Sequence, residues 1–149
     1  MSVSSEISGR CLCGAVSFTA EIAGRGIDVC HCSMCRRWTG GPLLGLAHDG
    51  AVRFQGAEHI GVYASSDWGE RGFCRVCGSS LYWRVRGTDE YSFCAGALDD
   101  QSALALTTEI FIDEKPGYYA FANETRKLTG EEAMASFMAG RQTDDTRDE

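Results

Sequence analysis

Short stretches of alternating apolar and polar residues recur along the chain between residues 15 and 112. Alternation with a period of two puts apolar side chains on one face of a strand and polar ones on the other. The clearest stretch predicts one face with Leu81, Trp83 and Val85 and an opposite face with Tyr82 and Arg84. Further strands are predicted at 15–20, 27–30, 43–47, 52–54, 60–63, 91–95 and 104–112. Glycine-containing turns separate these stretches, so the pattern predicts a mainly β fold.

One helix is predicted, near the C-terminus. Thr129 and Glu132 have the spacing of a capping box, in which each residue bonds the backbone of the other. The apolar residues that follow share one helical face: Ala133, Met134, Phe137 and Met138. We expect residues 1–8 to be a disordered polar terminus, residues 9–140 a single domain, and residues 141–149 an acidic disordered tail.

The charge balance bears on which partners to expect. The 149 residues carry a formal net charge of −7, which argues against nucleic acid or an anionic membrane as a partner. Residues 1–6 show no signal-peptide pattern, and no apolar run approaches the ~18 residues of a membrane span. We therefore expect a cytoplasmic protein whose thiols stay reduced, which favours metal binding over disulfides.

Seven of the eight cysteines fall into three tight groups: Cys11 and Cys13; Cys30, Cys32 and Cys35; Cys74 and Cys77. Structural zinc usually has four closed protein ligands, whereas catalytic zinc usually has three and one exchangeable position. The two pairs together predict a four-cysteine site that joins distant parts of the chain. The triple predicts a second zinc site with an open position.

The triple is the candidate for chemistry. If Cys30 and Cys32 lie on a strand, both thiols face one side and His31 faces the other, and Cys35 returns to the same point. One rival assignment makes Cys94 the fourth ligand, which would close the site, although a lone cysteine in an apolar strand is usually a small buried hydrophobe. Another rival recruits His31 or His48.

Other polar residues are candidates for substrate binding or proton transfer beside the three cysteines. Arg36 and Arg37 follow it directly and would bind a substrate carboxylate by bidentate hydrogen bonds, or would be ordinary solvated arginines. Candidates for a general base are Glu109, His48 and His59, although each is also typical of a solvated residue in a loop or strand.

The cysteine groups and their neighbours resemble a known family. The motifs are Gly9-x-Cys11-x-Cys13-Gly14, Cys30-His31-Cys32-x-x-Cys35-Arg36-Arg37, Arg71-x-Phe73-Cys74-x-x-Cys77-Gly78-Ser79 and Gly96-x-Leu98-Asp99. Across residues 9–119 the chain resembles the glutathione-dependent formaldehyde-activating enzymes, a domain that also occurs in the centromere protein V group.

The resemblance implies a β-tent fold of small antiparallel sheets, shared with a family of guanine-nucleotide-release chaperones. It implies structural zinc at Cys11, Cys13, Cys74 and Cys77 and a reactive zinc at Cys30, Cys32 and Cys35. One departure is Glu109, which stands where relatives often have a histidine.

The resemblance also implies carbon–sulfur lyase chemistry on a thiol adduct such as S-hydroxymethylglutathione, formed from glutathione and formaldehyde. The alternatives are a non-enzymatic module in which zinc holds loops that engage a protein, and redox or metal handling by exposed thiolates. A triple that faces an open cavity favours the enzyme, whereas a closed four-ligand site favours the module.

Overall fold

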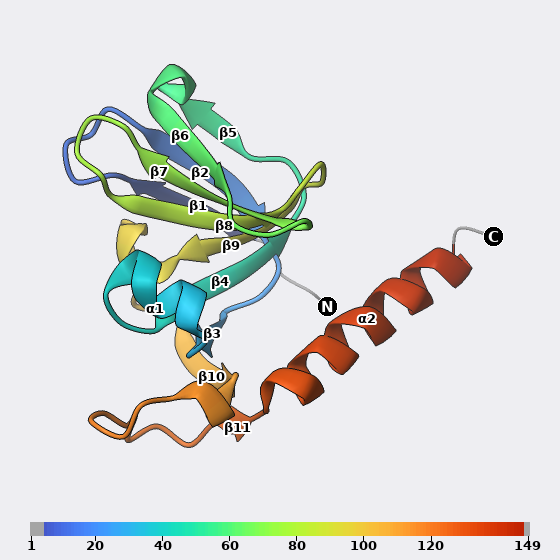
Figure 1. Cartoon of the computed structure of the whole chain (residues 1–149). Coiled ribbons are helices and arrows are strands. Elements are labelled where there is room, and N and C mark those ends of the chain that lie inside the picture. Colours follow the sequence, from blue (N-terminus) through green and yellow to red (C-terminus); the bar gives the residue numbers. More distant parts are fainter. Residues whose placement is uncertain (1–4, 148–149) are drawn as a thin grey trace.

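The computed structural model describes residues 5–147, which form two β-sheets and two α-helices (Figure 1). The smaller sheet is antiparallel and has the order β1-β2-β5. Its strands are β1 (Ser5–Arg10), β2 (Ser17–Ile22) and β5 (Arg53–Gln55). β1 begins inside the segment 1–8 expected to be disordered, because Ser5–Ser8 pair with Thr19–Ile22 of β2. Residues 1–4 lie outside the described residues.

The larger sheet has the order β11-β10-β3-β4-β9-β8-β7-β6. Its first four strands in the chain are β3 (Gly26–Cys30), β4 (Leu43–Asp49), β6 (Ile60–Ala64) and β7 (Gly69–Cys74). The other four are β8 (Ser80–Val85), β9 (Glu90–Cys94), β10 (Ala105–Ile110) and β11 (Arg126–Lys127). β10 runs parallel to both β3 and β11, whereas the other neighbours are antiparallel. The predicted mainly β, β-tent fold class is confirmed.

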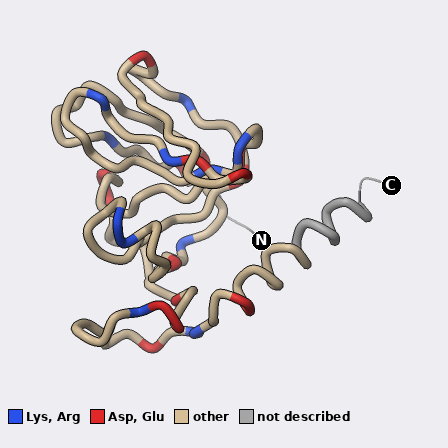
Figure 2. Tube along the Cα trace, in the orientation of Figure 1, with Lys and Arg blue, Asp and Glu red and all other residues tan. Residues whose placement is uncertain are grey.

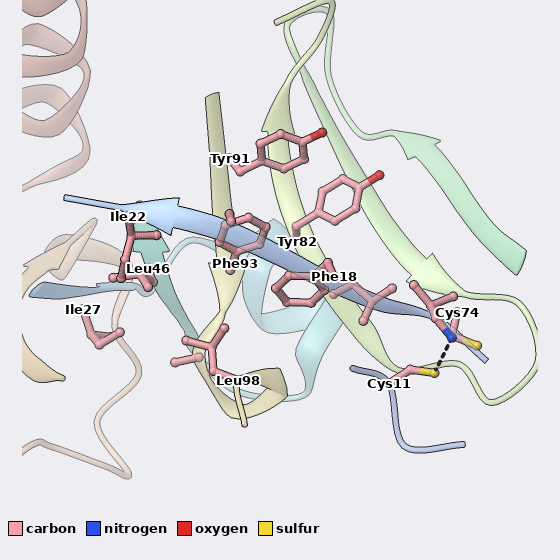
Figure 3. Close-up of a cluster of buried hydrophobic side chains, with 14 residues drawn as sticks. Cys11, Phe18, Ile22, Ile27, Leu46, Cys74, Tyr82, Tyr91, Phe93 and Leu98 are labelled. Carbon is pink, nitrogen blue, oxygen red and sulfur yellow. Dashed lines mark hydrogen bonds between the residues drawn. The ribbon is translucent and has the colours of Figure 1, made fainter. Parts of the chain in front are cut away.

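The main core lies between the two sheets (Figure 3). The rings of Phe18 in β2 and Phe93 in β9 stack there with centroids 4.8 Å apart. Both are fully buried, and truncating such a side chain to alanine typically costs about 3–5 kcal/mol. Cys11 and Cys74 lie at the edge of this same cluster, so one cysteine group is built into the core.

Three short 3₁₀ turns and two helices complete the fold. The 3₁₀ turns are η1 (Ala57–His59), η2 (Ala95–Ala97) and η3 (Ile112–Glu114). Helix α1 (Ser33–Thr39) was not predicted; it ends at Gly40, whose φ of 84° suits the left-handed position after a helix.

Helix α2 (Gly130–Arg147) begins at the predicted capping box. The Thr129 hydroxyl accepts from the Glu132 backbone N–H at 3.1 Å, and the Glu132 carboxylate accepts from the Thr129 N–H at 2.9 Å. α2 projects away from the sheets in Figure 1 and continues into the predicted disordered tail, a difference from the sequence expectation. Residues 148–149 lie outside the described residues.

Charged residues are distributed over many elements, with acidic and basic positions interspersed on both sheets (Figure 2). Among the described residues, no helix combines the length and the apolar character that a membrane crossing requires.

Candidate metal and substrate site

Two turns bring the four-cysteine group together. Cys11 and Cys13 follow β1, whereas Cys74 ends β7 and Cys77 lies in the turn after it. The Cys13 Sγ lies 3.7 Å from the Cys11 Sγ and 3.8 Å from the Cys74 Sγ, and all four sulfurs lie within 4.8 Å of one another. A tetrahedron with Zn–S bonds of about 2.3 Å has edges of about 3.8 Å, so this donor set fits a metal ion.

Hydrogen bonds to sulfur favour the thiolate form of Cys11 and Cys77, whereas burial and the neighbouring cysteines raise the pKa of Cys13 to about 11. The backbone N–H groups of Val16 and Ala15 donate to the sulfurs of Cys11 and Cys13 at 3.3 and 3.4 Å. The Ser79 hydroxyl lies 3.2 Å from the Cys77 sulfur, and this contact lowers the pKa of Cys77 to about 5. Thiolates are the form in which cysteine binds metal.

The three-cysteine group lies where β3 passes into α1. Cys30 is the last residue of β3, Cys32 is the N-cap of α1, and Cys35 lies in its first turn, with the three sulfurs within 4.8 Å of one another. The conditional placement of Cys30 and Cys32 on one strand is wrong, because the chain turns into the helix after Cys30. The Cys32 sulfur accepts from the Cys35 backbone N–H at 3.4 Å, which is the bond of a helix cap.

A negative charge on this group is concentrated on one sulfur. Hydrogen bonds from the Cys30 and Cys35 thiols lower the pKa of Cys32 to about 2, and the nearby Arg71 guanidinium acts in the same direction. The same contact with Cys32 raises the pKa of Cys30 well above its usual range. A metal ion bound by all three sulfurs would displace the protons that Cys30 and Cys35 hold.

A buried arginine contacts the group, and the sequence analysis named it only as part of a cysteine motif, without a predicted role. Arg71 of β7 is 4% exposed, and its Nη1 donates to the Cys35 sulfur at 3.5 Å. Its Nε donates to the Ser65 hydroxyl at 3.1 Å, and its guanidinium lies 5.2 Å from the centre of the Trp38 ring. The available signal was its position in β7, three residues before Cys74.

The three cysteines face a cavity of about 520 Å³. The cavity extends along β4 from Leu43, beside the cysteines, to Asp49 at the other end of the strand. Trp83 of β8 lines its floor, and Met134 and Phe137 of α2 cover one side. The described structure thus gives the cysteine group an open face toward this space.

The alternative ligands Cys94, His31 and His48 do not lie with the sulfurs of the three-cysteine group. Cys94 packs beside Cys35 and Leu43 but lies outside the set of mutually close sulfurs, and burial raises its pKa to about 12. His31 points away from the cysteines, as predicted: its Nε2 lies 2.8 Å from the Glu109 carboxylate and its Nδ1 2.8 Å from the Tyr119 hydroxyl. His48 lines the cavity without belonging to the sulfur cluster.

The other candidate residues have different surroundings. Arg36 donates from Nε to the His31 carbonyl at 2.9 Å, and Arg37 is exposed; neither lines the cavity, so their substrate role stays a prediction. Glu109 is 1% exposed and bonded to His31 and Thr125, and His59 lies in η1 beside Glu58. Of the three candidate bases, His48 is the one that lines the cavity.

Comparison with known proteins identifies the family. A family model described as glutathione-dependent formaldehyde-activating enzyme matches residues 6–114. The chain belongs to this family. An uncharacterized lyase of Schizosaccharomyces pombe is 34% identical over 134 residues, which cover 89% of this chain and 98% of the yeast protein. The family assignment therefore rests on most of the chain.

Two further proteins are similar over shorter regions. A Halomonas elongata protein, provisionally named a glutathione-dependent formaldehyde-activating enzyme, is 34% identical over 85 residues, which cover 51% of this chain and 54% of that protein. A crystal structure of a Rhodobacter sphaeroides protein superposes with a TM-score of 0.54 at 28% identity, covering 62% of this chain and 87% of that one. A fold similar to most of this chain thus occurs in a solved structure.

Proposed function

We propose that the chain is a zinc-dependent enzyme of the carbon–sulfur lyase type that acts on a small thiol adduct. S-hydroxymethylglutathione is the adduct that the family description suggests. The observation that carries the proposal is the open face of Cys30, Cys32 and Cys35 toward a cavity of about 520 Å³. A purely structural site would have its fourth position closed by the protein.

The two cysteine groups have different tasks in this proposal. Cys11, Cys13, Cys74 and Cys77 would hold a structural zinc that joins the turn after β1 to the end of β7. Cys30, Cys32 and Cys35 would hold the second zinc, which supplies a Lewis-acidic centre for a thiolate or an aldehyde oxygen. Soft thiolate ligands favour zinc among the common divalent ions.

The reaction requires three movements of charge and protons. In the lyase direction the carbon–sulfur bond breaks, its electron pair goes to sulfur, and the adduct hydroxyl loses its proton as the aldehyde forms. Arg71 would stabilise the negative charge at sulfur, since its guanidinium already donates to the Cys35 sulfur.

His48 lies five residues along β4 from Leu43, about 17 Å from the cysteine end of the cavity, so it is too far away to take the hydroxyl proton directly. Its ring stacks on Phe93, and its Nε2 lies 3.2 Å from the Ala51 carbonyl. The sheet floor and the helix beside the cavity would limit the access of water during the transfer.

Exchange NMR on a mixture of ¹³C-formaldehyde and glutathione tests this function at equilibrium. The wild type and Cys94→Ala should hold about two zinc ions per chain and accelerate exchange between free and adduct carbon. Cys35→Ser should keep the structural ion and lose the acceleration. Unchanged exchange in Cys35→Ser would refute the assignment. Two bound ions without any acceleration, for this or other thiols, would favour the binding-module alternative.

A further inference from the structure

The side chains around the three-cysteine cavity differ in kind from end to end. Near the cysteines the one cationic side chain is Arg71, and its guanidinium is already engaged by Cys35, Ser65 and Trp38. The middle of the cavity is mainly apolar, apart from Asp28 of β3, which lies opposite Gly45, and Ser92 of β9. The far end, where β4 ends and β9 begins, carries Asp49 and Glu90, which lie directly opposite each other in the strand register.

Aromatic rings form a continuous wall in the apolar part. The Trp68 and Trp83 rings meet edge to face with centroids 5.3 Å apart, and the Phe137 ring of α2 lies 5.2 Å from that of Trp68. Phe111 lines the same space. Walls of this kind bind an apolar or aromatic group through burial and ring–ring contact.

Acidic side chains along the cavity and at its far end disfavour an anionic ligand. Asp28, Asp49 and Glu90 all line the cavity, against the single guanidinium of Arg71. β4 covers the distance from Leu43 to Asp49 in six steps, or about 20 Å, so a ligand that extends from the cysteines along the strand meets these carboxylates. Glutathione carries two carboxylates and would need cations that the described lining does not offer beyond Arg71.

We propose that the thiol whose adduct this site binds is apolar or aromatic and lacks carboxylates, so that the cavity selects such thiols over glutathione. This proposal rests on the proposed function, because it names the substrate class of the same site. The aromatic wall supplies the affinity, and the acidic end rejects anions. α2 becomes a specificity element, since its Ala133, Met134 and Phe137 contribute to the wall.

A matched pair of thiols tests the proposal by binding alone. Benzyl mercaptan and 4-(mercaptomethyl)benzoate differ by one carboxylate, and glutathione serves as the third ligand. Isothermal titration calorimetry on the purified protein with its bound metal should give benzyl mercaptan a Kd at least about tenfold lower than either anionic thiol. Equal or tighter binding of glutathione would overturn the proposal.

Two variants test the contributions of the aromatic wall and of the acidic end separately. Phe137→Ala should weaken benzyl mercaptan by about tenfold, whereas Met138→Ala, at an exposed neighbouring position outside the cavity, should leave it unchanged. Asp49→Asn, at an exposed position, should improve 4-(mercaptomethyl)benzoate by about threefold without changing benzyl mercaptan. An unchanged Kd for benzyl mercaptan in Phe137→Ala would contradict the role of the aromatic wall. An unchanged Kd for 4-(mercaptomethyl)benzoate in Asp49→Asn would contradict the role of the acidic end.

The binding and exchange measurements test the substrate class and the lyase function independently. Selective binding of benzyl mercaptan without accelerated adduct exchange for any thiol would keep the substrate class and refute the lyase function. Accelerated exchange that favours glutathione, together with tighter glutathione binding, would keep the lyase function and refute the substrate class.

Discussion

Replacing Glu109 should destabilise the protein strongly, although this residue lies outside the cavity. Its carboxylate is 1% exposed and joins three segments: Oε1 lies 2.8 Å from His31 Nε2, and Oε2 accepts from the Thr125 hydroxyl at 2.6 Å. Lys127 Nζ lies 3.7 Å from Oε2. Glu109→Ala therefore leaves the buried His31 ring and the half-buried Thr125 hydroxyl without their acceptor, next to the residues that hold the three cysteines.

The magnitude follows from these contacts. Each buried group left unsatisfied costs about 1–3 kcal/mol, and the cost is larger where the lost partner is an ionised carboxylate. We expect Glu109→Ala to lower the free energy of unfolding by about 3–5 kcal/mol. Glu109→Gln keeps the shape and one acceptor, so about 1–2 kcal/mol is expected.

Urea unfolding at a fixed zinc concentration, followed by tryptophan fluorescence, measures both losses. Glu58→Ala is the matched control, because the Glu58 side chain is exposed and its only described ion pair is with His59; a change within about 0.5 kcal/mol is expected. Zinc content gives a second readout, since a displaced His31 shifts the backbone of Cys30 and Cys32. A loss below about 1 kcal/mol in Glu109→Ala would refute the buried-network argument.

A comparison of the wild type with Glu109→Gln also tests how stability depends on pH. Burial alone would raise the pKa of Glu109, but the hydrogen bonds from Thr125 and His31 outweigh it and lower the pKa below its ordinary 4.5. A lowered pKa in the folded state contributes stability above the unfolded value, and this contribution disappears as the pH falls through the folded value. The stability difference between wild type and Glu109→Gln should be constant above about pH 6 and shrink below 4.5. A difference that grows on acidification would contradict this sign.

Three further predictions concern the cysteine sites and the sheet. Arg71→Met should retain zinc but slow adduct exchange by about ten- to a hundredfold, as expected for one charge-assisted hydrogen bond, with Arg71→Lys intermediate; equal rates in NMR exchange would refute the role. Cys77→Ser should release one zinc ion by elemental analysis and lower the Tm, whereas Cys94→Ala should keep both ions. Gly72→Ala should destabilise by more than about 1 kcal/mol, because its Cβ would overlap the buried Tyr82 ring, and urea unfolding that matches the wild type would show that the ring can move.

Most strands and both cysteine groups could be predicted because their signals are local. Period-two alternation found the strands, and cysteine spacing found the clusters. Helix α1 escaped detection because seven residues are too few for a helical pattern, and its cap is a cysteine rather than Ser or Asp. β1 is polar along much of its length and is held as a strand by pairing with β2, which is a tertiary effect.

The face assignment of β8 was right in part. Trp83 and Val85 line the cavity, as one face requires, but Leu81 is fully buried in the core cluster together with Tyr82. The register between β7 and β8 shifts at Gly72/Phe73, so that the extra residue of a bulge lies at Leu81. A bulge depends on both strands, and alternation within one strand cannot reveal it.

β7 connects the two cysteine sites. Cys74 at its end belongs to the four-cysteine group, and Arg71, three residues earlier, contacts Cys35 in the other group. An odd separation in a strand places the two side chains on opposite faces of the sheet, and Arg71 pairs with Trp83 on the cavity side. A metal ion on the four cysteines would thus fix the strand that carries the arginine of the proposed reaction. Spacing predicted each cysteine group separately, but the connection through Arg71 depends on the strand order of the folded sheet.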